Sequence, residues 1–569
     1  MNSKKQKREQ QSFLYATLIL GISTVLVKAL GAFFRIPLAG LIGASGMGYF
    51  STAYDVYLPI YSLAMAGLPV AVSRIVASKI AEKRYRDARR ALTVAKRTFM
   101  VTGLVGFLLM FLVAVIVSYV ANNPGARPSM YIIAPSILFC CVMSAYRGYY
   151  EGVRNMFPTA ISSLIEAVCK LVLGYGFAYI VMQKFTGSAQ QKASYAAAAA
   201  MLGITIGTAL GALFLKIRHK RIGDGITKQD LALSPDPDTG MAIFKALVYF
   251  AIPVALGSLV NNVASMVDVV MVQRQLKHAV EASPQTFHNL YGKYLTNTDG
   301  TNISDSEIPN FLYGCYKGYA YTIFNLIPTI TSVVGVSALP VLTMAWTSRN
   351  KTEIKSNIES MVKVITLIAF PAGIGVTALA PQIISLLYKS PEAAISNNIL
   401  AILGIAACFA GMTTPLTNLL QAIERPSVPV KNIAVGCLIK IAVNYILVGS
   451  PKINILGAAI GTVCCYLYIA VADVFCLVKY SHVVPNLYAC IIKPLFAALC
   501  CGAAAYIVNA VAGNIISNGK ITAILAILCA VVVYVIAVSV FRCIEKKDLL
   551  TLPKGDKIAN VFAKLHIIR

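Results

Sequence analysis

Long apolar runs separated by short polar segments set the pattern of this chain. The runs at 100–121 and 521–541 show it most clearly, because about 20 mostly apolar residues cross the hydrocarbon core as one helix. The candidate spans are 13–38, 50–78, 98–121, 130–150, 158–182, 194–215, 245–272, 313–344, 361–388, 396–422, 428–449, 455–478, 487–511 and 520–541. The pattern predicts an all-α polytopic membrane protein with about 14 transmembrane helices.

Positive charge gathers in alternate polar segments. Lys and Arg cluster at 4–8, 79–97, 216–221, 349–355 and 542–569, whereas 41–49 has neither. With an even number of spans these basic segments share one side, so the positive-inside rule places both termini in the cytoplasm. Only 13% of the residues are charged, against about 25% in soluble domains. The net charge of +27 therefore indicates topology rather than nucleic-acid binding.

Short motifs recur at one offset along the chain. Leu68-Pro69-Val70 recurs as Leu339-Pro340-Val341, Arg154 as Arg425, and Lys170, within one residue of that offset, as Lys440. The recurrence predicts two six-helix lobes in parallel repeat, with two extra helices after them. The expected parts are an N-terminal lobe 1–222, a cytoplasmic linker 223–240, a C-terminal lobe 241–482, spans thirteen and fourteen within 483–543, and a cytoplasmic tail 544–569.

Charged residues inside the spans are the candidate chemistry, because a charge at the bilayer centre costs at least about 2.5–3.5 kcal/mol. The candidate cations taken from the spans are Lys28, Arg35, Arg74, Lys170, Lys245, Lys317 and Lys440, and the acids are Asp55, Glu166, Asp268 and Asp473. Cations outnumber acids, which predicts a water-filled cationic cavity between the bundles. Such a cavity favours an anionic passenger such as phosphate or pyrophosphate, which Arg contacts in bidentate fashion and Lys as a point charge.

Spacing divides these charges into groups. Lys28 and Arg35 are seven residues apart on one helix face, with no acid in that helix to neutralise them. Glu166 and Lys170 are four apart, so they form either a structural pair or a substrate contact. Two further pairs share a face: Lys440 with Asn444, and Asn261 with Asp268. Arg74 and Lys317 lie near span ends and either snorkel or face the cavity, whereas Lys245 is expected to snorkel.

Sequence motifs for metal binding, catalysis or ATP use do not occur. All five His lie in loops or tails, the 14 Cys are scattered without CxxC spacing, and neither HExxH nor GxxxxGK[ST] is present. No catalytic carboxylate motif supports an enzyme such as a membrane glycosyltransferase. We therefore expect no metal and no cofactor. The energy source is then the membrane potential or an ion gradient, with Na⁺ as a candidate ion.

Three motifs carry a resemblance to a known family. They are Arg147-Gly148-Tyr149-Tyr150-Glu151-Gly152 with the following Pro158-Thr159-Ala160, Gly67-Leu68-Pro69-Val70-Ala71-Val72-Ser73-Arg74, and Gly457-Ala458-Ala459-Ile460-Gly461-Thr462. The chain resembles the polysaccharide-exporter branch of the multidrug/oligosaccharidyl-lipid/polysaccharide (MOP) superfamily, which includes stage V sporulation protein B and the MurJ-type lipid II flippases. The resemblance covers essentially the whole chain.

That resemblance implies a V-shaped pair of lobes that flips lipid II by alternating access, with the headgroup in the cavity. Spans thirteen and fourteen would form a groove for the polyprenyl tail. The family's first-span cations map near Lys28 and Arg35. The predicted substrate-binding residues are Lys28, Arg35, Asp55, Arg74, Glu166, Lys170 and Lys317. One departure is the absence of an eighth-span Arg expected before Pro328, where Tyr321 and Thr322 stand and Lys317 is the nearest cation.

Some relatives bind sodium between helices of the C-terminal lobe. The predicted ion or coupling residues here are Asn262, Asp268, Lys440, Asn444 and Thr462, and the Lys440 ammonium could replace the ion. The alternatives are a flippase for another lipid-linked oligosaccharide (capsule, teichoic acid or spore polymer) and a cation-coupled drug exporter. The intramembrane cations disfavour the exporter. Expected partners are the lipid-linked anionic oligosaccharide, membrane lipids and cell-wall synthesis machinery, and we expect a monomer.

Overall fold

The computed structural model describes residues 13–65, 67–296, 300–515 and 519–543. Helices make up almost all of this part of the chain, which contains no strand and one isolated antiparallel bridge between Thr296 and Asn302. The basic N-terminal segment 4–8 and the predicted cytoplasmic tail 544–569 lie outside the described residues.

The chain forms two compact units, the first of residues 1–274 with 297–301 and the second of 275–296 with 302–569. The first contains α1 (Phe13–Met65), α2 (Leu68–Ala81), α3 (Tyr85–Val120), η1 (Pro124–Ala126), α4 (Arg127–Gly152), α5 (Phe157–Cys169), η2 (Lys170–Gly174), α6 (Tyr175–Lys184), α7 (Ala189–Arg221), α8 (Lys228–Ala232) and most of α9 (Gly240–Ala282). The predicted lobe boundaries at 222 and 241 stay a prediction.

The second unit holds the remaining helices. They are α10 (Pro284–Tyr291), η3 (Gly292–Tyr294), α11 (Ile308–Gly314), η4 (Cys315–Ala320), α12 (Tyr321–Phe324), α13 (Leu326–Thr347), α14 (Lys351–Ala378), α15 (Ala380–Leu387), η5 (Pro391–Ile395), α16 (Ser396–Ala422), α17 (Ser427–Val448), α18 (Leu456–Ser481), η6 (Tyr488–Ile492), α19 (Lys493–Ile515) and α20 (Gly519–Val540). Three of the short elements, η2, η4 and η6, are π-helical.

Helices long and apolar enough to cross a membrane number 11 in the described part of the chain, so a polytopic membrane protein is confirmed and the count of 14 is not. The first two predicted spans run together as Leu26–Ala81. Their boundary is a kink at Gly43 inside α1, where φ is 66° and only glycine fits without strain. The predicted span 245–272 falls in α9, whose described apolar stretch is Gly240–Ile252. The span 313–344 is divided among α11, η4, α12 and α13.

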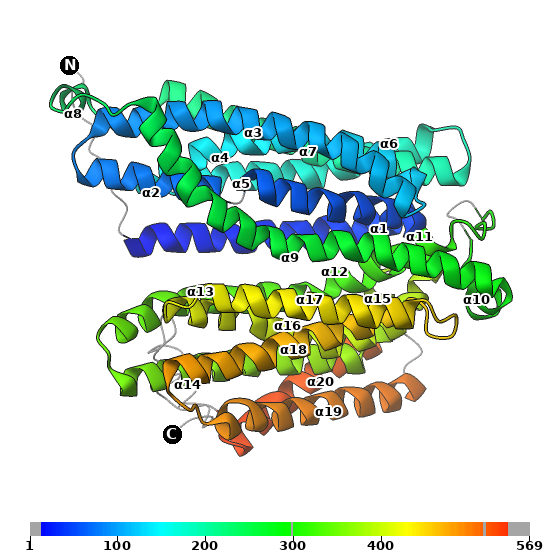
Figure 1. Ribbon diagram of the computed structural model, residues 1–569. Helices are drawn as coiled ribbons and strands as arrows, with labels where there is room; N and C mark the ends of the chain where they lie inside the picture. Colours follow the sequence, from blue (N-terminus) through cyan, green and yellow to red (C-terminus); the bar gives the residue numbers. More distant parts are fainter. Residues whose placement is uncertain (1–12, 66, 297–299, 516–518, 544–569) are drawn as a thin grey trace. The chain divides into compact units, whose positions relative to one another are not determined.

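In the first unit, α4 packs against α2, α3 and α7, and α7 also packs against α1, α5 and η2 (Figure 1). Lipid supplies no hydrophobic drive between helices, so close approach of small residues stabilises such a bundle. Gly203 of α7 shows this approach, because a Cβ there would collide with the backbone of Gly174 in η2. Gly67 likewise lies against the Ala251 carbonyl of α9. The contact at Gly203 fixes the helix that carries Lys170.

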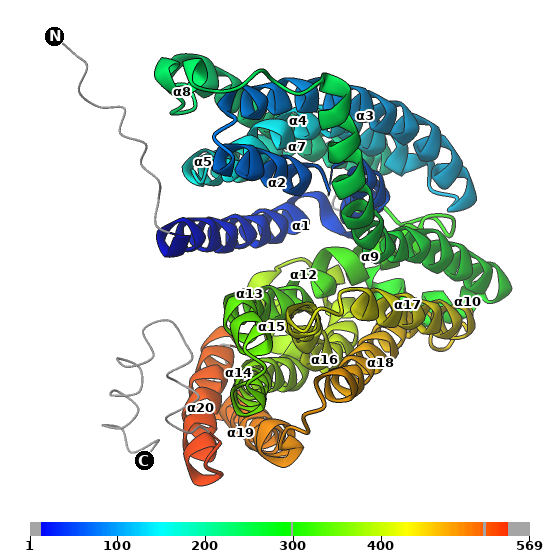
Figure 2. The same ribbon diagram turned by 60° about the vertical axis from the view of Figure 1, so that its left-hand side comes forward.

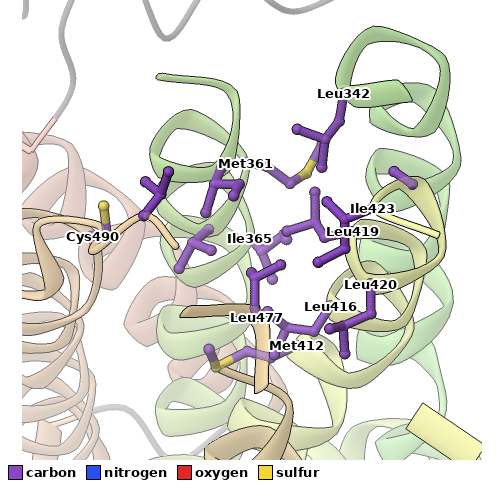
Figure 3. Packing of buried hydrophobic residues seen from close by; sticks show 14 of the residues in the cluster. Leu342, Met361, Ile365, Met412, Leu416, Leu419, Leu420, Ile423, Leu477 and Cys490 are labelled. Atoms are coloured by element: carbon purple, nitrogen blue, oxygen red, sulfur yellow. The ribbon is translucent and has the colours of Figure 1, made fainter. Parts of the chain in front are cut away.

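In the second unit, α16 packs against α13, α14 and α18, while α19 packs against both α14 and α20 (Figure 2). Figure 3 shows the apolar cluster that joins these helices. Leu416 and Leu420 of α16 are fully buried there, beside Ile365 of α14, Leu342 of α13 and Leu477 of α18. The cluster therefore holds α16 at the middle of its bundle.

The basic segment after α2 binds an acidic connection between α7 and α9. Asp238 accepts from Lys79 Nζ at 2.8 Å and from Arg84 Nη2 at 2.6 Å. Arg89 forms a bidentate pair with Asp224, at 2.8 and 2.9 Å. Several of the cations that set the predicted topology thus also tie the 222–240 segment to the first unit.

Candidate functional site

Two cations of the first unit face one aromatic ring. Arg35 Cζ lies 5.2 Å and Lys170 Nζ 5.3 Å from the centroid of the Tyr54 ring. Each cation also faces a phenylalanine, Arg35 facing Phe50 at 5.9 Å and Lys170 facing Phe34 at 5.2 Å. Aromatic faces attract cations electrostatically without neutralising them. The arrangement therefore holds two positive charges close together and leaves their charge available to an anion.

The backbone places these residues on α1 and η2. Arg35 lies before the Gly43 kink and Tyr54 after it, so both halves of α1 contribute. Lys170 begins the π-helix η2. Single-turn π-helices inside α-helices occur often at functional sites. The wider turn, fixed by the contact of Gly174 with Gly203, sets where the Lys170 side chain points.

Glu166 pairs with Arg147 and not with Lys170. Arg147 Nη2 lies 3.3 Å from Glu166 Oε2, and Arg147 Nε donates to Ser162 Oγ at 2.9 Å. The spacing of Glu166 and Lys170 predicted a pair that the structure does not form, because the α4 guanidinium approaches the carboxylate from the neighbouring helix. Sequence reasoning missed Arg147 as a site residue. Arg147 could have been found because it begins the motif at 147–152, but that motif was used only to identify the family.

Asp55 is the second carboxylate of this neighbourhood. It is buried, with 8% of its surface exposed, and it lies close enough to Tyr54 to interact with it electrostatically, as do Arg35 and Glu166. Three cations, Arg35, Lys170 and Arg147, and two acids, Asp55 and Glu166, thus belong to the surroundings of Tyr54. We call these five residues with Tyr54 the Tyr54 cluster, and one positive charge is left in excess when all are ionised.

Lys28 and Arg74 lie elsewhere in the first unit. Lys28 is two turns before Arg35 in α1 and its side chain is exposed within the unit. Arg74 of α2 lies over Phe250 of α9, with 4.2 Å between its Cζ and the ring centroid. This cation–π contact joins α2 to α9. Arg74 therefore has a packing role, in addition to the two roles expected from its position near a span end, snorkelling and facing the cavity.

Lys317 lies in the second unit, buried to 3% exposure inside the π-helix η4. Its Nζ is 4.3 Å from the centroid of the Tyr321 ring and 5.8 Å from that of Tyr316. The Tyr316 hydroxyl lies 3.1 Å from Thr462 Oγ1 of α18, so the two hydroxyls share a hydrogen bond. Tyr316 and Tyr321 thus pack their rings against the Lys317 ammonium.

The predicted coupling residues fall into two groups. The Asn444 side chain and the Lys440 backbone carbonyl of α17 lie against Gly461 of α18, where a Cβ would collide with Asn444 Oδ1. Lys440 also interacts electrostatically with Tyr466, as does Tyr321. Together with Thr462, these residues form one polar region of the second unit.

The other coupling residues, Asn262 and Asp268, belong to α9 in the first unit. Asn262 Nδ2 donates to Ser62 Oγ at 2.6 Å, and Asp268 is buried at 2% exposure. The side chain of Asn261 lies outside the described residues. The first unit also buries Gln273 of α9, which donates to Thr52 and accepts from Asn123. Hydrogen bonds at Asn262 and Gln273 thus join α9 to α1.

Comparison with known proteins identifies the family of the chain. A family described as polysaccharide biosynthesis protein matches residues 13–346, and the MatE family matches 317–446. Lipid II flippase MurJ of Bacillus subtilis is 22% identical over 475 residues, which cover 80% of this chain and 81% of the relative. Stage V sporulation protein B of the same organism is 23% identical over 554 residues, covering 96% of this chain and 98% of the relative.

Solved structures share the fold. Lipid II flippase MurJ in an inward closed conformation superposes with a TM-score of 0.63 at 16% identity, over 92% of this chain and 98% of that one. An inward-facing multidrug resistance MATE transporter gives 0.60 at 16% identity, over 82% of this chain and 98% of that one. The family match spans more than half of the sequence and the relatives extend over nearly all of it. The chain therefore belongs to the polysaccharide biosynthesis protein family of the MOP superfamily.

Proposed function

We propose that the chain is a flippase that moves undecaprenyl-pyrophosphate-linked peptidoglycan precursor, lipid II, from the inner to the outer leaflet by alternating access. The observation that carries the proposal is the Tyr54 cluster. Arg35 and Lys170 share one ring, while Glu166 is already engaged by Arg147. Two cations held over an aromatic ring are suited to the diphosphate of a lipid-linked headgroup.

The relatives support the same class of cargo. One relative is named a lipid II flippase, and the family name refers to polysaccharide biosynthesis. A second candidate is a flippase for another lipid-linked oligosaccharide, such as a spore polymer. The full-length similarity to stage V sporulation protein B favours that candidate. Both use the same diphosphate chemistry and differ in the glycan.

A drug exporter is the weaker interpretation of the MatE similarity. A site for organic cations needs surplus negative charge, whereas the Tyr54 cluster carries three cations and two acids. We propose that no enzymatic step and no cofactor is involved, and that the membrane potential or an ion gradient drives transport. The protein would act as a monomer in the bacterial cytoplasmic membrane, with both termini cytoplasmic and cell-wall synthesis machinery as partner.

Complementation tests the proposal. In cells depleted of their lipid II flippases, the wild-type chain should restore growth and the appearance of lipid II in the outer leaflet. Arg35→Ala and Lys170→Ala should lose this activity at equal membrane abundance. Lys245→Ala removes an exposed cation at the start of α9 and should retain it. Failure of the wild-type chain, with rescue of a capsule or spore-polymer flippase deletion instead, would favour the second candidate.

A further inference from the structure

An open polar pocket lies in the second unit, and its lining includes neither Lys317 nor Lys440. Its volume is about 460 Å³, and α15, α16, α19 and α20 form its walls. The polar side chains that line it are Gln382, Ser385, Asn397, Asn509 and Thr522. No charged side chain is among the described lining residues. The cavity lies where α19 ends and α20 begins, at the same end of the bundle as the starts of α15 and α16.

Two amide oxygens in this lining are buried without a partner. Gln382 Oε1 and Asn397 Oδ1 accept no hydrogen bond from any residue that the structure describes. Buried polar groups in proteins are nearly always satisfied by protein, water or ligand, because an unmet acceptor keeps its full desolvation cost. Asn509 of α19 adds a third amide to the same wall. The cavity thus presents acceptors that a ligand with several donors would satisfy.

The composition of the lining selects the class of ligand. An anion such as phosphate would need cationic or clustered N–H donors, and a divalent metal ion is usually bound by at least one carboxylate. This lining instead offers neutral amides and hydroxyls beside the apolar ring of Pro381 and the open surfaces of Gly513 and Gly519. Hydroxyl groups that both donate and accept match such a surface. The volume falls within the range of about 300–1,000 Å³ that small-molecule sites occupy.

We infer that this cavity binds an uncharged, hydroxyl-rich group, such as one sugar ring. The sugar could belong to the glycan of a lipid-linked precursor or to the headgroup of a bilayer glycolipid, and the chemistry of recognition is the same for both. The site does not depend on the proposed function, because none of its lining residues belongs to the Tyr54 cluster.

Binding of a simple glycoside tests the inference. The probe is methyl β-D-glucopyranoside, titrated onto the full chain in lipid nanodiscs and followed by saturation-transfer-difference NMR. Asn397→Leu and Gln382→Leu each remove a buried acceptor. Each should weaken binding about tenfold, the change expected for loss of roughly one hydrogen bond. Asn398→Leu is the matched control, because Asn398 is exposed on the same helix and outside the cavity lining.

Equal binding by Asn397→Leu and Asn398→Leu, or no saturation transfer to the wild-type chain, would overturn the inference and leave a water-filled cavity. Should the leucine variants fail size-exclusion chromatography, Asn509→Ala replaces them, because this half-buried side chain can be shortened without burying new apolar surface. Retained binding by that variant and by Ser385→Val together would also overturn the inference.

Competition separates the two sources of the sugar. Nanodiscs containing monoglucosyl diacylglycerol should displace the glycoside if a bilayer glycolipid occupies the cavity. A soluble pyrophosphoryl disaccharide should displace it if the occupant is the glycan of a lipid-linked precursor. Displacement by either supports the site and identifies its source, whereas displacement by neither contradicts it. Complementation of a flippase deletion is scored separately, so failure of the proposed function and failure of this site give different results.

Discussion

Arg147 of α4 and Glu166 of α5 form an ion pair across 3.3 Å. Lys170, one turn after Glu166, instead contacts the ring of Tyr54. The Arg147 side chain is 13% exposed and that of Glu166 30%, so both charges are largely withdrawn from solvent. Removing one partner would leave the other poorly compensated. The pair therefore has a structural role that can be separated from any contact with cargo.

A double-mutant cycle on this pair measures that role. Arg147→Met should lower the free energy of unfolding by about 1–3 kcal/mol, since Glu166 and Ser162 both lose a charged donor. Glu166→Gln should cost less, because a neutral amide still accepts from Arg147. The double variant Arg147→Met/Glu166→Gln should be more stable than the sum of the two changes predicts. Thermal unfolding of the purified protein provides the measurement, and strictly additive changes would show that the two side chains are not coupled.

The Tyr54 ring should be replaceable by phenylalanine but not by leucine. Tyr54→Phe keeps the aromatic face on which Arg35 and Lys170 rest. Tyr54→Leu removes that face, and each cation–π contact is worth about 0.5–2 kcal/mol. We expect the phenylalanine variant to unfold at the wild-type temperature and the leucine variant to unfold earlier. If the two variants behave alike, the cations are held by something other than the ring.

The segment that joins α7 to α9 should detach at low pH. Hydrogen bonds from Lys79 and Arg84 hold the pKa of Asp238 below its ordinary value of 3.8. Burial opposes a similar shift at Asp224, yet the hydrogen bonds from Arg89 and Tyr149 lower the pKa of that carboxyl as well. A lowered folded-state pKa gives stabilisation that is complete above the unfolded pKa and lost as the pH falls through the folded one. The contacts should thus be intact at neutral pH and be lost below about pH 4.

Hydrogen exchange over residues 222–240 provides the measurement for this segment. Asp238→Asn should raise exchange at neutral pH towards the level that the wild-type chain shows in acid. Asp236→Asn is the control, because its side chain is 99% exposed beside Arg86 and exposed pairs contribute little. Equal exchange in both variants would mean that the Asp238 contacts do not hold the segment.

Close packing at Gly203 gives a prediction about the π-helix η2. A Cβ at Gly203 would collide with the backbone of Gly174, whereas a Cβ at Gly176, two residues further along, would meet nothing within 4 Å. Gly203→Ala should therefore destabilise the protein by about 1–3 kcal/mol. Gly176→Ala should be neutral or stabilising by about 0.5–1 kcal/mol, because alanine favours the helix. Both variants can be compared by thermal unfolding, and a neutral Gly203→Ala would contradict the close approach of α7 to η2.

How far the fold followed from sequence can be seen at α1 and at η4. The apolar runs predicted helices in both places, because lipid leaves helices as the way to satisfy the backbone. They separated the first two spans between residues 38 and 50, and Gly43 breaks α1 into two helices within that interval; hydropathy alone could not single out Gly43 as the residue at the break. Nor could they predict the π-turn around Lys317, because hydropathy has the same value for either helix type.

Site residues followed from the cost of burying charge, which singled out Arg35, Lys170 and Lys317. The contacts that these side chains make could not be predicted from the sequence. The spacing of Glu166 and Lys170 is a rule for one helix, whereas Arg147 approaches from α4. Tyr54 was overlooked for a related reason. An aromatic residue in an apolar run is most simply interpreted as lipid-facing, and its contact with the cations of two helices becomes evident only in the structure.

Lys440 provides a last prediction, about coupling. Its backbone carbonyl lies beside Gly461 of α18, one turn before the buried Asn444, and its charge acts on Tyr466. We propose that the Lys440 ammonium takes the place of a coupling sodium ion. Lys440→Ala should therefore abolish transport, and the wild-type chain should transport equally well with and without sodium. Lys452→Ala removes an exposed cation after α17 and should leave transport unchanged. Vesicles with defined internal and external sodium provide the measurement, with outer-leaflet lipid II as the readout. Strict dependence of the wild-type chain on sodium would mean that the ammonium does not replace the ion.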